Sequence, residues 1–243
     1  MSWQGALVGL GNPGPTYART RHNCGYAVAD ALLEMAGRDG TVEELGGKRF
    51  TCDLWRVRMP ALPGDWLVAK PLTFMNDSGR CIQPLLAWHK LEPANMVVVH
   101  DELDIMPGEL RFKFAGGHAG HRGVKSTVEL LGTPDFYRLR LGIGHPPHKG
   151  DVLNWVLGRP DAADAAALAE AVKDALAVFL KFATDGLEPA VNLARALSRE
   201  RMAAAKDTAK EAAKAEQEKK EAPAGQGKKE TSAGQTPKAE SDA

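Results

Sequence analysis

The sequence predicts one α/β domain with a mixed β-sheet, followed by a charged tail. Short apolar runs alternate with longer segments of helical periodicity, two strand patterns alternate strictly between apolar and polar residues, and the composition changes near residue 200. Of the 243 residues, 44% are hydrophobic, which is enough for one sizeable core. We therefore expect a folded domain over residues 1–198 and a tail over residues 199–243.

Six strands are expected, from short apolar runs bounded by Gly or Pro or from residues that alternate in polarity. In chain order they are residues 6–10, 50–54, 66–69, 96–99, 110–114 and 137–143. Met96–Val99 is apolar and β-branched, so it is expected to be a buried strand. Residues 110–114 and 137–143 alternate strictly, which indicates a mixed sheet in which some strands lie near an edge.

Four helices are expected from apolar residues at helical spacing and from capping signals. In chain order they are residues 24–35, residues 78–89, a segment that begins near 124, and residues 164–182. Asn23 is the expected N-cap of the first helix, and Gly37 is expected just past its end. Pro84 is expected to kink the second helix or to mark an early boundary.

The tail is expected to be mostly disordered. From Arg201 onward there are no aromatic residues, and Met202 is the last large apolar residue. Such a segment has no apolar face to bury, and its Gly- and Pro-containing second part cannot offset its ordering entropy. The alternative is an arm that binds RNA, but the charges of both signs are interleaved, whereas such arms usually carry blocks of like charge.

Charge and cysteine content limit the class of protein. Lys+Arg and Asp+Glu both total 31, and this neutral sum does not exclude a nucleic-acid partner, because local arrangement matters more. The three cysteines are odd in number and lack a CxxC spacing, which favours a reducing compartment without structural zinc. The N-terminus lacks the pattern of a signal peptide, and no apolar run approaches the ~18 residues of a membrane span.

The first of four polar loops, Gly9–Gly14, matches GxGxxG by its letters. A dinucleotide site needs that loop to open a helix directly, with an acid about 20 residues further on. Pro13 opposes such a helix start, and Asp30 falls within a helix pattern, so a dinucleotide-binding enzyme is disfavoured. Two alternatives remain: a tight turn that needs glycines, or a turn that projects Asn12 and His22 into one cleft.

The second and third loops each carry side chains with two interpretations. Phe74 and Asn76 suit a nucleobase, through ring stacking and amide hydrogen bonds, but they equally suit a core position and a helix cap. Asp101 lies in the loop directly after the β-branched strand, where a carboxylate either caps a loop or orients a histidine and stabilises its protonated form. His22 at another loop favours the second role for Asp101.

The fourth loop, residues 115–123, is rich in glycine and precedes a helix, so its amides are expected to face an anion. His118 and His121 suggest a metal, but no Cys or carboxylate completes a ligand set there, and we predict no metal site. Five cations lie close together in the sequence and form either a solvated face or a phosphate-binding patch. They are Lys113, Arg122, Lys125, Arg138 and Arg140.

Taken in order, these motifs resemble those of bacterial peptidyl-tRNA hydrolases. The matching segments are residues 8–14 with Tyr17 and residues 20–23, residues 70–76 with 78–79, and residues 100–104, 117–123 and 138–144. The match runs from Leu7 to about Leu197. The resemblance implies a single α/β domain with a twisted mixed sheet flanked by helices (phosphorylase/hydrolase-like), which acts as a cytoplasmic monomer without metal or cofactor.

The resemblance also implies an activity and roles by position. The expected reaction is hydrolysis of the ester between a peptide and the terminal ribose of tRNA, which recycles the tRNA from peptidyl-tRNA. His22 would be the base, Asp101 would stabilise its working form, and Asn12 would distinguish a blocked α-amino group from a free one. The positions implied to contact the tRNA end or its phosphates are Tyr17, Phe74, Asn76, Lys113 and Arg140.

Arg122 departs from the family pattern, which usually has Asn at this position. A carboxamide donates and accepts hydrogen bonds, whereas a guanidinium only donates. Arg122 would then either hold a tRNA phosphate or fold away from the site. This departure is the one feature that favours the alternative function, a non-catalytic RNA-binding relative of the same fold.

Overall fold

The computed structural model describes residues 3–221, without the side chains of residues 47, 149, 209 and 211–221. In chain order its elements are β1 Trp3–Gly9, η1 Arg21–Asn23, α1 Cys24–Asp39, β2 Thr41–Glu44, η2 Gly47–Phe50, β3 Cys52–Met59, β4 Leu62–Pro71, η3 Met75–Asp77, α2 Ser78–His89, η4 Pro93–Asn95, β5 Met96–Glu102, β6 Leu110–Phe114, α3 Arg122–Leu131, β7 Tyr137–Gly142, η5 Lys149–Asp151, α4 Val152–Leu157, α5 Ala162–Asp185 and α6 Leu187–Glu221. The chain divides into two compact units, Met1–Ala204 and Ala205–Ala243.

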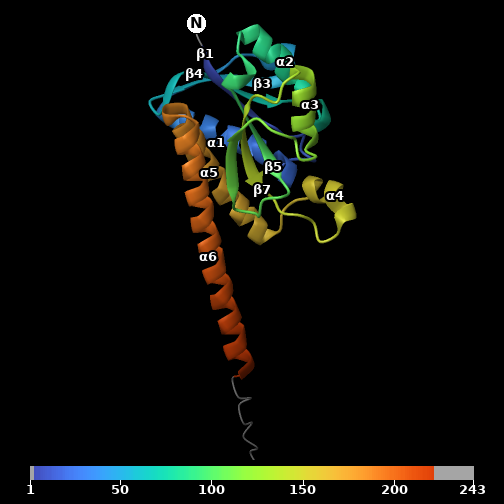
Figure 1. Cartoon of the computed structure of the whole chain (residues 1–243), viewed down its shortest axis with the longest axis vertical. Coiled ribbons are helices and arrows are strands. Elements are labelled where there is room, and N and C mark those ends of the chain that lie inside the picture. Colours follow the sequence, from blue (N-terminus) through green and yellow to red (C-terminus); the bar gives the residue numbers. More distant parts are fainter. Residues whose placement is uncertain (1–2, 222–243) are drawn as a thin grey trace, which may run out of the picture. The chain divides into compact units, whose positions relative to one another are not determined.

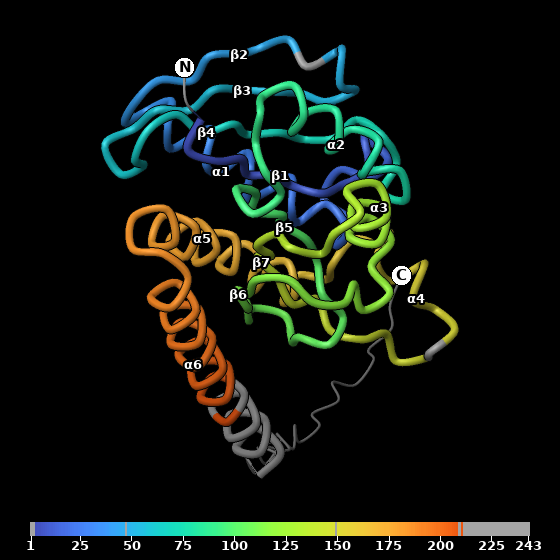
Figure 2. The backbone as a smooth tube through the Cα atoms, turned by 45° about the horizontal axis from the view of Figure 1, so that its top comes forward, coloured from blue at the N-terminus to red at the C-terminus, as the bar shows by residue number. Residues whose placement is uncertain are grey.

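The described strands form one seven-stranded sheet in the order β2-β3-β4-β1-β5-β7-β6. The central pairs β4–β1, β1–β5 and β5–β7 are parallel, whereas the outer pairs β2–β3, β3–β4 and β7–β6 are antiparallel. Figure 2 shows this succession from β2 and β3 at one side to β6 at the other. The predicted mixed sheet is therefore confirmed, with residues 110–114 as an edge strand.

Helices cover both faces of the sheet, as Figure 1 shows for α1 and α5 and for α2 and α3. On the first face Val97 and Val99 of β5 pack in a cluster with α1 and α5. On the other face Val98 packs with residues of α2 and α3. Every residue of β5 is buried, because helices enclose this central strand on both sides.

A side chain forms hydrogen bonds with two backbone groups of the edge strand β6. The Ser198 hydroxyl on α6 accepts a hydrogen bond from Leu110 N at 3.0 Å and donates one to Leu110 O at 2.9 Å. This contact pairs backbone groups that an edge strand otherwise leaves to solvent.

Some element boundaries differ from the sequence predictions. Helix α1 continues to Asp39, so Gly37 lies inside it, and the C-cap is Gly40. Asn23 occupies the N-cap position of α1 but makes no capping bond, because its amide binds the backbone of Asn12 instead. Pro84 lies within α2. The strand β2 and the helix α4 were not predicted, because four exposed residues and six residues are too short to show a periodicity.

Helix α6 extends from Leu187 to Glu221, so residues 199–221 are helical where the sequence predicts mostly disorder. The Ala, Lys and Glu residues that dominate this segment are strong helix formers, and local propensity accounts for the difference. Residues 222–243, the rest of the predicted tail, lie outside the described residues. The domain boundary at residue 198 stays a prediction. Among residues 3–221, no helix combines the length and apolarity needed to span a bilayer.

Candidate active site

The candidate site lies where two central parallel strands end. The loop after β1 leads into η1, which carries His22, and Asp101 stands near the end of β5. Because β1 and β5 pair in parallel, their carboxyl ends meet at one edge of the sheet. This topology brings together two residues that are 79 positions apart.

His22 and Asp101 form a buried hydrogen-bonded pair. His22 Nδ1 lies 2.7 Å from Asp101 Oδ1, and the two side chains are 10% and 3% exposed. A carboxylate only accepts hydrogen bonds, so Nδ1 carries a proton, and in the neutral ring Nε2 keeps its lone pair. The structure thus brings the two residues together as the sequence analysis expects.

A second histidine binds the same carboxylate oxygen. His121 Nε2 lies 3.0 Å from Asp101 Oδ1, and His121 Nδ1 accepts the backbone N–H of Val124 at 3.2 Å as the N-cap of α3. Since Nδ1 is an acceptor, Nε2 must carry the proton that is donated to Asp101. Sequence reasoning missed this role, because histidine is not among the preferred N-cap residues and the helix was expected to begin near residue 124 rather than at Arg122.

The pKa of Asp101 reflects two opposing effects. Burial raises the pKa of this carboxyl, but attraction to His22 and His121 and their hydrogen bonds outweigh burial. The pKa of Asp101 therefore lies well below its usual range. The carboxylate stays ionised near neutral pH, which holds the His22 ring in one tautomer.

His100 adds a third imidazole next to this cluster. Its Nδ1 donates to the backbone oxygen of Asp101 at 2.7 Å, and its ring centroid lies 4.7 Å from that of His121. Burial lowers the pKa of His100 well below its usual value, so the ring is neutral near pH 7. Its buried Nε2 has no hydrogen-bond partner among the described residues.

The sequence analysis predicted no metal site because no carboxylate lies near His121 in the sequence, but the fold brings Asp101 next to this histidine. His22, Asp101 and His121 offer ligand atoms that all lie within 4.8 Å of one another. A metal on His121 Nε2 would move the ring proton to Nδ1, where it would face the N–H of Val124 at 3.2 Å. The hydrogen bonds of His121 therefore do not fit a metal ligand in this arrangement.

Asn12 is 5% exposed and is hydrogen-bonded to Asn23, the residue after His22. Its Oδ1 accepts the backbone N–H of Met75 at 2.8 Å, and the amide of Asn23 bonds its backbone N and O, each at 2.9 Å. Oδ1 is thereby occupied, which leaves the amide nitrogen to donate to a ligand. Asn12 lines a neighbouring groove rather than the cavity that contains His22 and Asp101.

His22 and Asp101 line a cavity of about 350 Å³. Helix α4 contributes the apolar residues Val152, Leu153 and Val156 to its lining, and α3 contributes Arg122. Arg122 is exposed in the first turn of α3, at the rim of this cavity, so it does not fold away from the site.

Of the residues expected at the tRNA end, Phe74 and Asn76 are exposed and Tyr17 is partly buried. Phe74 is 57% exposed, so it is not a core residue, and its ring meets that of Tyr17 edge-to-face with centroids 6.3 Å apart. Asn76 is exposed in η3, one residue after the Met75 that binds Asn12. Exposed rings of this kind offer faces on which bases stack.

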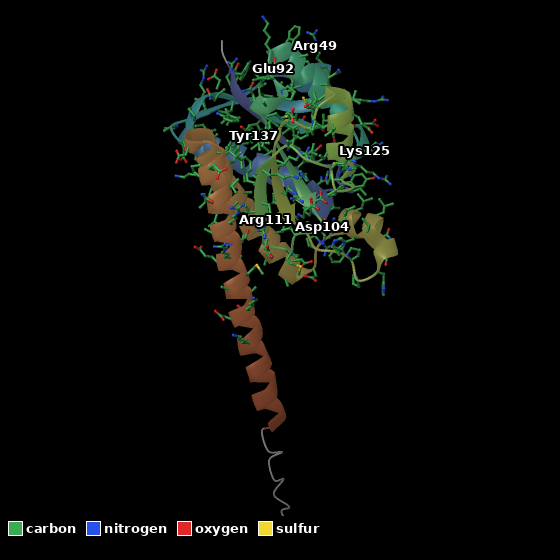
Figure 3. All side chains as sticks on the ribbon, viewed as in Figure 1. Arg49, Glu92, Asp104, Arg111, Lys125 and Tyr137 are labelled. Carbon is green, nitrogen blue, oxygen red and sulfur yellow. The ribbon has the colours of Figure 1, made fainter. Side chains whose placement is uncertain are left out.

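Lys113 and Arg140 line a different cavity, of about 420 Å³. Its charged lining residues are Arg111, Lys113, Arg140 and Arg195 with Asp104 and Glu109, and Figure 3 labels Arg111 on β6 and Asp104 in the loop after β5. Arg140 donates twice to Glu102 Oε2, at 2.9 and 2.6 Å. Burial and the nearby Arg140 and Arg138 lower the pKa of Lys113, as expected for a cation near other cations. An anion bound there would relieve that repulsion.

Arg138 differs from the other cations of the predicted patch. It is fully buried, donates to the backbone oxygen of Gly117 at 2.6 Å and lies over the ring of Phe136 at 4.7 Å. It therefore supports the glycine-rich loop, whereas Arg122 and Lys125 are exposed on α3. Alternating charge in a strand pattern did not distinguish the buried arginine from its neighbours.

Comparisons with known proteins agree on one family. The family model described as peptidyl-tRNA hydrolase matches residues 6–204. The chain is 63% identical over 201 residues to a peptidyl-tRNA hydrolase of Desulfovibrio desulfuricans, covering 83% of this chain and 88% of that relative. It is 47% identical over 198 residues to a peptidyl-tRNA hydrolase of Nitratidesulfovibrio vulgaris, covering 81% and 98%. A crystal structure of peptidyl-tRNA hydrolase from Acinetobacter baumannii is similar with a TM-score of 0.72 and 35% identity, covering 80% of this chain and 95% of that one.

Proposed function

This chain belongs to the peptidyl-tRNA hydrolase family, and we propose that it hydrolyses the ester bond between a peptide and tRNA, with His22 as the general base. The observation that carries this proposal is the buried bond of 2.7 Å between His22 Nδ1 and Asp101, in the lining of a cavity. We further propose that the protein acts as a cytoplasmic monomer without metal or cofactor. The hydrogen bonds that occupy both nitrogens of His121 support the part of this proposal that concerns metal.

In the proposed mechanism, His22 Nε2 takes a proton from a water molecule while the oxygen of that water attacks the ester carbonyl carbon. The ionised Asp101 stabilises the imidazolium that forms. The tetrahedral intermediate then collapses, the bond to the ribose oxygen breaks, and that oxygen takes the proton from His22. The products are a peptide with a free carboxylate and a tRNA with a free terminal hydroxyl.

Asn12 is proposed to recognise the peptide side of the substrate. Its Oδ1 accepts the Met75 N–H, so its amide nitrogen is the group left to donate to a carbonyl of the peptide in the groove that Asn12 lines. A free aminoacyl-tRNA carries an ammonium where peptidyl-tRNA has an amide. An ammonium beside an N–H donor is poorly solvated, which would favour the blocked substrate.

The tRNA is proposed to contact both the aromatic pair and the basic cavity. Tyr17, Phe74 and Asn76 would bind the unpaired end of the acceptor strand by stacking and by amide hydrogen bonds. Lys113 and Arg140 would bind phosphates, and Arg122 at the rim of the catalytic cavity would hold another phosphate. A guanidinium suits this role because it donates in a planar fork.

The alternative is a relative that binds tRNA without cleaving it, and only Arg122 in place of the usual Asn favours it. A direct test compares hydrolysis of N-acetylated and free aminoacyl-tRNA by wild type and His22→Ala. We expect wild type to release the acetylated amino acid and spare the free form, and His22→Ala to be slower by about 10²–10⁴-fold.

A matched control removes a histidine of similar geometry elsewhere. His145 Nε2 lies 2.8 Å from Asp104 Oδ1, but this pair is exposed. His145→Ala should retain the wild-type rate. Equal rates for wild type and His22→Ala would exclude His22 from the mechanism, and absence of turnover in wild type would favour the non-catalytic relative.

A further inference from the structure

Arg21, the first residue of η1 and the neighbour of His22, is buried and contacts residues between the end of α4 and the start of α5. The Arg21 side chain is 6% exposed. Its Nη2 lies 2.9 Å from Asp164 Oδ2 at the start of α5, and its Nη1 donates to the backbone oxygen of Arg159 at 3.0 Å. The backbone N–H of Arg21 also donates to Gly158 O at 3.1 Å.

An aromatic ring completes this arrangement. Arg21 Cζ lies 3.7 Å from the ring centroid of Trp155, a residue of α4. The indole N–H of Trp155 donates in turn to Gly144 O at 2.9 Å and lies 3.2 Å from Ile143 O, just after β7. A guanidinium both stacks on such a ring and forms planar hydrogen bonds, which an ammonium cannot do at once.

The same helix forms part of the catalytic cavity. Val152, Leu153 and Val156 of α4 line the cavity together with His22 and Asp101, and α4 contacts η1 directly. Figure 1 shows α4 as a short helix near the ends of β5 and β7. Arg21, the residue before His22, thus connects the backbone of η1 to α4, the helix that forms the apolar wall of the cavity.

We propose that Arg21 is a positioning residue for the reaction: it fixes η1 to α4 and α5, and thereby sets the place of the His22 imidazole relative to the substrate. The inference rests on the proposed role of His22 as base. Neither a reacting atom nor the substrate needs to touch Arg21. A shift of about 1 Å in a catalytic group costs up to about 100-fold in rate, so partial loosening of η1 should appear in kcat.

The test is a double-mutant cycle of Arg21→Lys and His22→Ala, measured by single-turnover hydrolysis of N-acetyl-aminoacyl-tRNA with excess enzyme. Arg21→Lys keeps the charge near Asp164 but loses the planar stack on Trp155. In the wild-type background we expect the rate of the chemical step to fall about tenfold, with KM changed less than about twofold. In the His22→Ala background the same change should cost less than about twofold, because there is no base left to misplace.

Arg159→Lys is the matched control. Arg159 lies between α4 and α5 with an exposed side chain, and its hydrogen bond with Arg21 uses the backbone oxygen, which the substitution retains. It should leave both parameters unchanged. An equal loss in both backgrounds, a loss confined to KM, or no loss at all would overturn the proposal. If His22→Ala alone retains the wild-type rate, the assignment of the base fails first, and this inference fails with it.

A second variant keeps the test decisive if Arg21→Lys does not fold. Trp155→Phe retains a ring beneath the guanidinium but removes the indole N–H that binds the chain after β7. We expect a fall of about threefold in the chemical step that again disappears in the His22→Ala background. Persistence of the full loss without His22 would contradict positioning of the base.

Discussion

Two His–Asp pairs in this molecule have nearly the same length and opposite surroundings. His22 Nδ1 lies 2.7 Å from Asp101 Oδ1, and the two side chains are 10% and 3% exposed. His145 Nε2 lies 2.8 Å from Asp104 Oδ1, and these side chains are 59% and 66% exposed. The pairing of residue types therefore does not by itself identify a catalytic pair.

Burial and additional partners make the difference. Asp101 accepts a second hydrogen bond from His121, and the two histidines hold its pKa well below the usual range in spite of burial. Water and salt screen an exposed pair such as His145 and Asp104, and its side chains remain free to move. Asp101 is therefore a buried carboxylate that two histidines fix in place, whereas Asp104 is exposed beside one histidine, and three experiments sharpen or break this contrast.

The largest effect is expected for Asp101→Asn. An amide at this position offers an N–H toward His22 Nδ1, which favours the wrong tautomer and cannot stabilise the imidazolium. We expect kcat for N-acetyl-aminoacyl-tRNA to fall by about 10³–10⁴-fold, with a small change in KM. Steady-state hydrolysis of labelled substrate measures both parameters.

The exposed pair provides the control for this variant. His145→Ala should change kcat less than about twofold, because its loss leaves only a solvated carboxylate. A similar loss of activity for both variants would mean that burial does not distinguish the two pairs, and the contrast would be broken.

A smaller effect is expected for Lys113→Ala, which tests binding rather than chemistry. Lys113 lines the basic cavity and has no ion-pair partner among the described residues. We expect KM to rise about tenfold at low salt with kcat unchanged, and the slope of log KM against log salt to become shallower by about one. Lys173→Ala, on the exposed part of α5 beside Glu170, should change neither KM nor its salt dependence. A fall in kcat alone would contradict a phosphate-binding role for Lys113.

The smallest effect concerns stability, through His100. Burial lowers the pKa of His100 well below 6.5, so below about pH 6.5 the unfolded chain binds a proton that the folded chain does not. The free energy of unfolding is therefore unaffected by His100 above that pH. It decreases as pH falls below it, by up to about 1.4 kcal/mol per pH unit. His100→Asn keeps an N–H donor for the Asp101 backbone and does not titrate, so urea unfolding between pH 7.5 and 5.5 should show a flatter dependence. An unchanged slope in this variant would show that another group causes it.

Local pattern was sufficient for most of the fold. The β-branched run at Met96–Val99 and the alternation at Leu110–Phe114 are visible in the sequence, and the structure has strands at both. Patterns failed where an element is too short, as in β2 and α4, or where side chains have alternative partners. Asn23 is such a case, since its amide binds Asn12 across the loop and does not cap α1.

The sequence by itself determined the order of most strands and helices and the motifs that resemble one enzyme family, because both depend on residues close together in the chain. It also placed His22 and Asp101 on loops that follow two strands, although the structure has Asp101 within β5. Only the tertiary structure decided that these strands are parallel neighbours, that His121 binds the same carboxylate, and that Arg21 reaches Trp155 and Asp164. The physical reason is that burial and hydrogen bonding between residues 20 to 143 positions apart follow from how the strands pair and the helices pack, which no local period records.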